Sequence, residues 1–305
     1  MSVKYTGYWM FICNPKKWEI DRFLMSGRSY DSFIITEWQK DHFKPGQLGI
    51  VRVGIDRRNK TQLGGREHLK PGIYAIVEIL DEPKYTTDAD DLFWIDKEEA
   101  KQPRYRVKIK YLKSMLNKPL LIQQIKHDKL LGKDKVIIKN FQGSSFPISE
   151  ISFKRIMELT SSSELLENID EFDADSLEEI AHIEKKFKYA VPEVKEVISK
   201  RIERGKIAEK LKEINNYKCQ ICEAMGKNPK VFKKPDGKYY IEVHHIIPVS
   251  FLIRGTLNFT NLITVCPNHH RQLHYGNVQI LKNTEKEVVF KIDGKIIEIK
   301  KGVIC

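Results

Sequence analysis

The spacing of cysteine and histidine is the feature of this 305-residue sequence that most restricts its fold. Cys219 and Cys222 form a C-x-x-C pair, and Cys266 and His269 form a C-x-x-H pair with the same spacing. A lone C-x-x-C pair can be redox-active, but the two pairs together supply the thiolate and imidazole ligands of a tetrahedral zinc ion. Four protein ligands leave no open coordination position, so we expect a structural Zn²⁺.

Further histidines surround this zinc set. Pro267 favours the first turn of a helix that begins after Cys266. On such a helix, His269 and His270 project about 100° apart, whereas His270 and His274 are four residues apart and share a face. We therefore expect His269 to bind the zinc ion, and His270 and His274 to face a different site.

A strand is predicted before this helix, over residues 239–247. Here β-branched and aromatic residues lie between a Pro-Asp-Gly turn sequence and Pro248. Adjacent side chains of a strand point to opposite faces, so His244 and His245 should have different roles. One of them can bind a metal ion while the other stays free as a base.

The order of these motifs resembles the HNH endonucleases. It comprises the C-x-x-C pair, E-x-H-H-I-I-P and N-L-I-T-V-C-x-x-H-H-x-x-x-H, within about residues 200–276. The resemblance implies a ββα-metal fold, in which a β-hairpin and a helix hold a divalent metal ion. By position, His245 corresponds to the general base, and Asn261 to the residue that braces the loop and orients that base. The catalytic metal would be bound by the remaining matched histidines, His244, His270 and His274.

This assignment agrees with the chemistry of phosphodiester hydrolysis. A histidine titrates near neutral pH and can accept a proton from the attacking water. A divalent cation stabilises charge on the phosphate and on the leaving oxygen. We expect Mg²⁺ or Mn²⁺ in this role, with Ni²⁺ and Co²⁺ as alternatives, because imidazole ligands suit these metals at least as well as they suit Mg²⁺.

The N-terminal half has a different pattern. Over residues 1–150, turn sequences separate the short runs YWMFIC, QLGIVRV, GIYAIVEIL, RYRVKIKYL and KVIIKNF, which predict strands of a small closed or nearly closed sheet. From Ser152 to about Asn216 the sequence is charged and helix-forming, with Pro192 suited to a helix start and Gly205 to a break. Near the C-terminus, Asp-Gly between EVVFKI and KIIEIK predicts a hairpin.

The N-terminal region resembles the EVE domains of the PUA-like family. The resemblance rests on the opening YWMFICNPKKW, on KPGQLGI and GIYAIV, and on QGSSF at residues 142–146. It implies a β-barrel with flanking helices and a pocket for a flipped base, chiefly a modified cytosine in DNA. Such a pocket needs aromatic walls for stacking and polar groups for the edge of the base. Our candidates are Trp18 and Trp38 for the walls, and Asn14 and Ser144 for the polar groups.

Together the motifs predict an α+β protein with three parts. These are a PUA-like modified-base reader at residues 1–158, a helical linker at 159–195 and an HNH nuclease domain with a structural zinc at 196–305. The predicted function is that of a modification-dependent restriction endonuclease, which cuts DNA containing 5-methylcytosine or 5-hydroxymethylcytosine. The net charge of +12 agrees with a polyanionic partner. The alternatives are a protein that binds modified nucleic acid without cutting it and an RNA-directed nuclease.

Two further expectations concern assembly and location. Double-strand cutting by a nuclease with one active site suggests a homodimer. The sequence has no run of about eighteen apolar residues, and its first residues lack the pattern of a signal peptide. We therefore expect no membrane partner and a cytoplasmic location.

Overall fold

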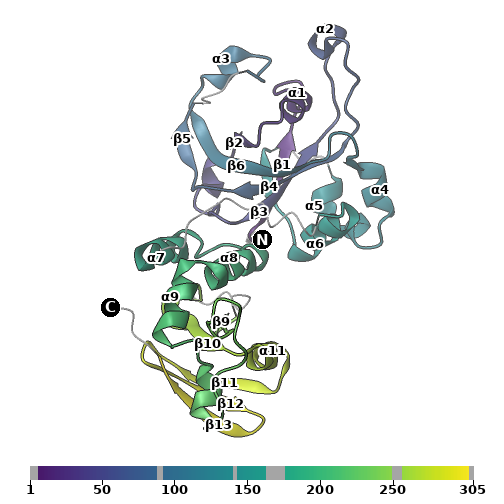
Figure 1. The fold of residues 1–305 in the computed structure, drawn as a ribbon. Coiled ribbons are helices and arrows are strands. Elements are labelled where there is room, and N and C mark those ends of the chain that lie inside the picture. The colour runs from purple at the N-terminus through teal and green to yellow at the C-terminus, as the bar shows by residue number, and fades with distance from the viewer. Residues whose placement is uncertain (1–5, 88–91, 140–142, 163–175, 249–255, 302–305) are drawn as a thin grey trace. The chain divides into compact units, whose positions relative to one another are not determined.

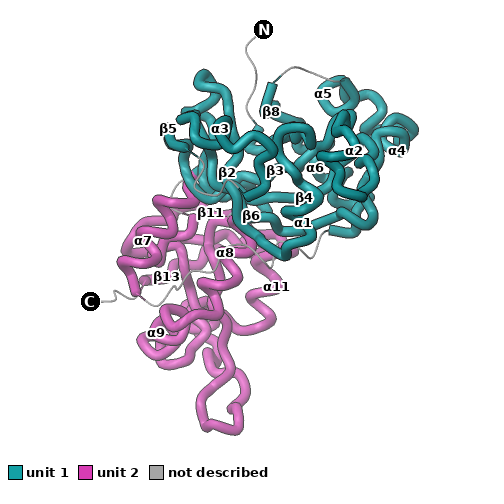
Figure 2. Tube along the Cα trace, turned by 90° about the horizontal axis from the view of Figure 1, so that it is seen from above, with its two compact units in different colours: residues 1–171, 189–194 teal, residues 172–188, 195–305 magenta. Residues whose placement is uncertain are grey.

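The chain folds into two compact units, which Figure 2 shows in different colours. The computed structural model describes residues 6–87, 92–139, 143–162, 176–248 and 256–301. Unit 1 comprises residues 1–171 and 189–194, and unit 2 comprises residues 172–188 and 195–305. The domain boundaries expected at residues 158 and 195 stay predictions.

Unit 1 is built on a curled sheet (Figure 1). Within the described residues, its strands follow the order β2-β6-β4-β3-β1-β8, with β5 paired to β6 and β7 paired to β4. The β1–β3 pair is parallel, and the other pairs are antiparallel. The strands are β1 Tyr8–Cys13, β2 Tyr30–Ile34, β3 Leu48–Val53, β4 Gly72–Ile79, β5 Lys84–Thr86, β6 Arg104–Ser114, β7 Leu120–Leu121 and β8 Ser145–Pro147.

Short helices flank this sheet. They are α1 Ile20–Met25, η1 Glu37–Gln39, α2 Lys60–Leu63, α3 Lys97–Ala100, α4 Ile122–His127, η2 Leu131–Lys133, α5 Lys135–Ile138 and α6 Glu150–Leu159. The prediction of a strand for KVIIKNF is wrong, because its first residues form α5. The Asp134 carboxylate caps this helix by accepting a hydrogen bond from the backbone N–H of Val136 at 2.9 Å. An apolar run this short suits a strand or a helix, so the N-cap decides.

The apolar runs of the sequence form the core of unit 1. Every residue of β3 and of β4 is buried, so both faces of these strands are covered. Trp9 of β1 is fully buried and stacks on Phe43 with 3.8 Å between ring centroids. Packing of this kind holds the strands that position the cavity described below.

Among the described residues, the second half of the chain begins with four helices, and the strands and the remaining helices follow them. Its elements are α7 Leu177–Lys186, α8 Pro192–Arg204, α9 Lys206–Ile214, α10 Gln220–Ala224, β9 Glu242–His245, η5 Phe259–Asn261, β10 Leu262–Val265, α11 Pro267–Tyr275, β11 Val278–Asn283, β12 Glu287–Ile292 and β13 Lys295–Lys300. The expected helix start at Pro192 and the expected break at Gly205 are both confirmed, since Gly205 separates α8 from α9.

Two small sheets complete unit 2. Strands β9 and β10 pair antiparallel, with Leu262 opposite His245, and α11 follows β10 directly. Strands β11, β12 and β13 form a separate sheet. The predicted hairpin is confirmed between β12 and β13, where Asp293 and Gly294 have φ angles of 47° and 82°. A two-residue turn of this type requires positive φ at both positions, which explains the Asp-Gly pair.

In the part of the chain that the structure describes, no helix is both long enough and apolar enough to span a membrane.

Candidate functional site

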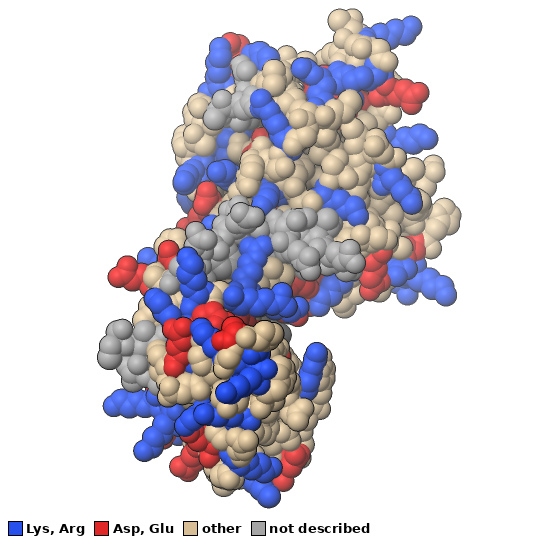
Figure 3. Space-filling model, in the orientation of Figure 1, with Lys and Arg blue, Asp and Glu red and all other residues tan. Residues whose placement is uncertain are grey.

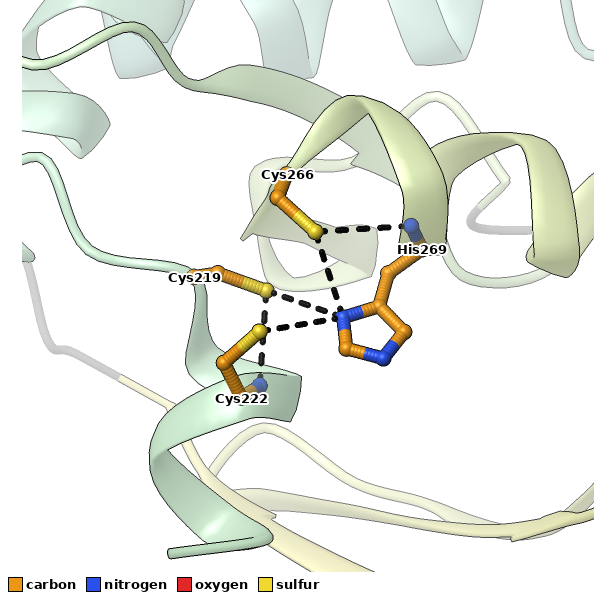
Figure 4. A group of neighbouring side chains, drawn as sticks. All are labelled: Cys219, Cys222, Cys266 and His269. Atoms are coloured by element: carbon orange, nitrogen blue, oxygen red, sulfur yellow. Dashed lines mark hydrogen bonds between the residues drawn. The ribbon is translucent and has the colours of Figure 1, made fainter. Parts of the chain in front are cut away.

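Two helix starts bring the predicted zinc ligands together (Figure 4). Cys219 is the N-cap of α10, and its sulfur accepts a hydrogen bond from the backbone N–H of Cys222 at 3.4 Å. Cys266 is the N-cap of α11 and accepts from the backbone N–H of His269 at 3.5 Å. In each case the first helical turn carries the residue three positions later back toward its own cap. The two C-x-x-ligand spacings therefore aim at one point.

The distances within this cluster fit a tetrahedral zinc ion. The Nδ1 atom of His269 lies 3.3 Å from Sγ of Cys219, 3.4 Å from Sγ of Cys222 and 3.3 Å from Sγ of Cys266. Ordinary zinc–sulfur and zinc–nitrogen bond lengths give tetrahedral edges of about 3.5 Å. Burial, and then the neighbouring Cys219, raise the pKa of the Cys222 thiol to about 12. A bound cation would hold this group as a thiolate at neutral pH.

A second cluster consists of His244 from β9 with His270 and His274 from α11. The Nε2 atoms of His270 and His274 lie 3.2 Å apart. The ring centroid of His244 is 4.9 Å from that of His270 and 4.7 Å from that of His274. One nitrogen from each ring lies within 4.8 Å of the others, which suits a shared cation. His269 turns to the cysteines and its neighbour His270 turns to this second cluster, as helical geometry predicts.

Hydrogen bonding and burial prepare these imidazoles to bind a metal. The Nδ1 atom of His270 is hydrogen-bonded to the carboxylate of Glu242, which also accepts from the Tyr240 hydroxyl at 2.7 Å. This contact places the proton on Nδ1 and leaves the Nε2 lone pair of His270 facing His274. Burial lowers the pKa of His244 to about 2, and burial also lowers the pKa of His274. Neutral imidazole is the form that binds metal, so the cluster fits a divalent cation.

His245 contacts α8. Its Nδ1 atom lies 2.7 Å from Oε1 of Glu203 and 2.9 Å from Oγ of Ser199. Its Nε2 atom is buried and has no hydrogen-bond partner among the residues that the structure describes. The adjacent histidines of β9 thus have different surroundings, as expected from strand geometry.

One cleft of 930 Å³ joins these groups. His245 and the three histidines of the second cluster all line it. Basic side chains from three helices line it as well, namely Lys200, Arg204, Lys212 and Arg271. Three glutamates, Glu196, Glu203 and Glu242, line it too. The cleft therefore brings His245 and the three-histidine cluster together with both basic and acidic side chains.

Asn261 contacts the loop beyond β9. Its amide nitrogen donates to the backbone carbonyls of Ile247 at 3.0 Å and Thr256 at 2.9 Å, and its Oδ1 accepts from the N–H of Ile247 at 3.0 Å. These bonds tie together the two described ends of the loop. The side-chain contacts of His245 are made by Glu203 and Ser199, and the role of Asn261 in orienting the base stays a prediction. The sequence analysis missed Glu203 and Ser199, because nothing local in α8 links its Ser/Glu pair to a strand so far along the chain.

Unit 1 contains a cavity of 890 Å³ between β1, β2 and β6. It is lined by Asn14, Trp18 and Ser144, so three of the four predicted base-pocket residues lie together. Trp18 is nearly buried and packs against Phe23, with 5.1 Å between ring centroids. The Ser144 hydroxyl oxygen is buried and has no hydrogen-bond partner within the described part of the chain.

Trp38, the other predicted wall residue, does not line this cavity. It is 60% exposed on η1. Its neighbour Gln39 is fully buried, and its side chain is hydrogen-bonded to both the hydroxyl and the backbone carbonyl of Ser145. Because these bonds draw Gln39 inward, the short turn directs Trp38 to solvent.

Other aromatic residues line the cavity instead. Trp94 forms an isolated β-bridge with Trp18, and the guanidinium of Arg106 lies 5.5 Å from its ring centroid. Tyr85 and Tyr105 also line the cavity, in an edge-to-face pair with 5.2 Å between centroids. The sequence analysis missed Trp94 because it stands in an apolar stretch typical of a core.

Two family profiles match this chain. The profile of the EVE domain matches residues 63–159, and that of the HNH endonuclease matches residues 219–276. The chain therefore belongs to the proteins that join an EVE domain to an HNH endonuclease domain. The predicted fold class is confirmed: an α+β chain with a PUA-like sheet in its N-terminal half and the HNH fold in its C-terminal half.

Individual relatives match parts of the chain. The type IV methyl-directed restriction enzyme EcoKMcrA of Escherichia coli (strain K12) is 46% identical over 56 residues, which is 18% of this chain and 19% of that enzyme. Anaredoxin of Nostoc sp. is 30% identical over 78 residues, which is 26% of this chain and 84% of that protein. The chain thus spans about a fifth of the restriction enzyme's length.

Solved structures match about half of the chain. A hypothetical protein from Leishmania major has a TM-score of 0.35 and 16% identity, over 52% of this chain and 97% of its own. Human THYN1, solved in complex with DNA that contains 5-methylcytosine, has a TM-score of 0.33 and 13% identity, over 50% of this chain and 96% of its own.

Proposed function

We propose that this protein is a metal-dependent endonuclease that hydrolyses phosphodiester bonds in DNA containing 5-methylcytosine or 5-hydroxymethylcytosine. One observation carries the proposal: His245, whose Nε2 has no hydrogen-bond partner among the described residues, lines the same cleft as the three-histidine cluster. This arrangement supplies a proton acceptor and a cation site for one reaction, beside basic side chains that suit a phosphate backbone.

The residues of the cleft would divide the reaction between them. His245 accepts a proton from water at Nε2 as the water oxygen bonds to phosphorus and the bond from phosphorus to the leaving oxygen breaks. A divalent cation bound by His244, His270 and His274 supplies positive charge that stabilises the phosphate and the leaving oxygen. Arg271 and Lys200 are placed to attract the substrate backbone. Mg²⁺, Mn²⁺, Ni²⁺ and Co²⁺ all suit this chemistry, and the imidazole ligands favour the last three.

The EVE domain supports a requirement for a modified base. Its cavity is bordered by aromatic rings and polar atoms, the combination that holds a flipped base by stacking and by hydrogen bonds. The restriction enzyme related to this chain is methyl-directed by name, which agrees with the same proposal. Lys and Arg side chains are spread over both units on the face in Figure 3, consistent with a polyanionic partner.

A cleavage assay tests the proposal directly. Plasmid prepared with and without cytosine methylation is incubated with the protein and each of the four metals, and products are resolved on gels. We expect metal-dependent cutting of the methylated plasmid only. Binding without cutting would favour a non-cleaving reader, equal cutting of both plasmids would exclude modification dependence, and preferential cutting of RNA would indicate an RNA-directed nuclease.

A substitution in the cavity tests the reader separately. Ser144→Ala is expected to weaken binding to a duplex with one 5-methylcytosine by about 5-fold, because a buried hydrogen bond contributes about 1 kcal/mol. Fluorescence anisotropy in a His245→Ala background measures the affinity without cutting. The matched control is Ser114→Ala, an exposed serine at the end of β6 that does not line this cavity. Equal affinities for Ser144→Ala and its parent would remove Ser144 from the pocket.

We further propose that the protein cuts both strands as a homodimer. Each chain provides one cleft with one three-histidine cluster among its described residues, whereas a double-strand break needs two hydrolytic events. Sedimentation of the protein on a modified duplex should show two chains per DNA. A single chain bound to DNA that is cut in both strands would contradict this.

A further inference from the structure

We propose that Glu203 and Ser199 of α8 are positioning residues for the HNH base, holding His245 in one tautomer and one orientation. The proposal rests on the proposed function, since it assigns the groups that prepare the base for proton transfer. Both residues precede the stretch that matches the HNH family, residues 219–276. The active site therefore extends into a helix upstream of the family motif.

Glu203 contacts His245 at two points. Its Oε1 atom lies 2.7 Å from Nδ1 of His245 and 3.3 Å from the backbone nitrogen of the same residue. One oxygen thus contacts both the ring and the main chain of His245. These two contacts fix the ring relative to β9, so rotation of the side chain would break the shorter one.

The contact with Glu203 determines which ring nitrogen of His245 carries the proton. An ionised carboxylate is a hydrogen-bond acceptor only, so the Nδ1 atom of His245 must be the donor. A neutral imidazole with its proton on Nδ1 has a lone pair on Nε2. Nε2 is the buried nitrogen without a partner in the described structure, and its ring lines the cleft. Glu203 therefore leaves Nε2 with a lone pair that can accept a proton.

The contacts between α8 and His245 are largely shielded from water. His245 is 3% exposed, Ser199 is 6% exposed and the Glu203 side chain is 19% exposed. Hydrogen bonds in such surroundings compete little with water and hold their geometry well. Ser199 adds a hydroxyl 2.9 Å from the same Nδ1 atom. Ser199 and Glu203 stand four residues apart on one helix, so a single face of α8 presents both.

The packing of α8 explains how this face stays in place. Ile198 and Ile202 are fully buried beside the two polar residues. These two positions are thus shielded from water while the polar pair meets β9. The same arrangement recurs in the metal cluster, where Glu242 contacts Nδ1 of His270. Each of the two histidines is thus held by its own carboxylate, and only one of the two carboxylates lies within the HNH motif.

Single-turnover cleavage of modified DNA gives the first test. Glu203→Ala should lower the rate by about 100-fold, since proton transfer contributes about 10²–10⁴-fold and the base loses its orientation. Glu203→Gln keeps a hydrogen-bond acceptor of the same shape, so its cleavage rate should fall by only about 10-fold. This variant also shows whether the loss in Glu203→Ala comes from misfolding, because it preserves the size of the side chain. The affinity for DNA should stay unchanged in both. The matched control is Glu298→Gln, an exposed glutamate on β13 that does not line the cleft and should cut at the parental rate.

Nitrogen NMR reports the tautomer of His245, which should not change if Glu203 only stabilised the fold. In protein labelled with ¹⁵N-histidine, the His245 signals are assigned by their loss in His245→Ala. The parent should show a protonated Nδ1 and an unprotonated Nε2 at neutral pH. Glu203→Ala should shift His245 toward the other tautomer or toward a mixture, while the signals of His269 stay in place.

The two tests separate this proposal from the proposed function. A parental rate for Glu203→Ala, or an unchanged His245 tautomer in that variant, would overturn the positioning role. Failure of the parent itself to cut any DNA would overturn the endonuclease proposal, and the tautomer measurement would still decide the role of Glu203. An equal loss of rate in Glu298→Gln would show a general charge effect and would also overturn the proposal.

Discussion

Replacing His245 with alanine is expected to lower the rate of DNA cleavage by about 10³-fold, because general base catalysis contributes about 10²–10⁴-fold. The imidazole lines the cleft beside the three-histidine cluster, and its Nε2 has no hydrogen-bond partner in the part of the chain that the structure describes. Its removal takes away the proton acceptor and leaves the three-histidine cluster and both cysteine-capped helices intact. Single-turnover kinetics measures the rate, and circular dichroism verifies that the variant is folded.

A matched histidine substitution sharpens this result. His182→Ala changes an exposed histidine of α7 and should cut at the parental rate. His270→Ala should also lose activity, but metal titration should show weaker cation binding in that variant and parental binding in His245→Ala. If His245→Ala kept more than a tenth of the parental rate, the assignment of the base would be wrong.

The second large effect is expected from Cys219→Ala, which should remove the bound zinc and unfold unit 2. Structural zinc ions contribute apparent binding energies of about 10–16 kcal/mol in zinc-finger peptides, which equals or exceeds the whole stability of an ordinary domain. Cys219 is fully buried and belongs to the core of unit 2. Elemental analysis measures zinc per chain, and calorimetry measures the unfolding transitions.

Cys13→Ala provides the control for this experiment. Cys13 is also a buried cysteine, but it lies in the core of unit 1 and far along the chain from the zinc ligands. The zinc content of Cys13→Ala should equal that of the parent protein. A full zinc content in Cys219→Ala, with parental unfolding of unit 2, would show that the cluster is not a structural metal site.

Much of the candidate site follows from local geometry that the sequence encodes directly. A C-x-x-ligand spacing at a helix start places two ligands together, and both pairs do so at α10 and α11. The rotation of about 100° per helical residue separates His269 from His270. The alternation of a strand separates His244 from His245. These rules need only neighbouring residues, so they predict that adjacent histidines belong to different sites. The grouping of His244 with His270 and His274 came from the resemblance to HNH endonucleases.

Two expectations about unit 1 differ from the structure, one because of a local helix cap and one because of a contact with a segment distant in the chain. KVIIKNF was ambiguous as a short apolar run, and the Asp134 cap turned it into a helix. The polar neighbours of Trp38 favour a place in the base pocket. Hydrogen bonds between Gln39 and Ser145 instead hold Gln39 in the interior and leave Trp38 in solvent. In both cases a pair of hydrogen bonds favours one of the conformations that the local sequence permits.

The sequence by itself determined the two families, the ligands of the two candidate metal sites and the separate roles of adjacent histidines, because helix and strand periods act over a few residues. Only the tertiary structure decided that Glu203 and Ser199 contact His245, and that Trp94 lines the cavity with Trp18. The physical reason is that these contacts follow from the packing of buried apolar side chains around them. Such packing brings distant segments together without leaving a local pattern in the sequence.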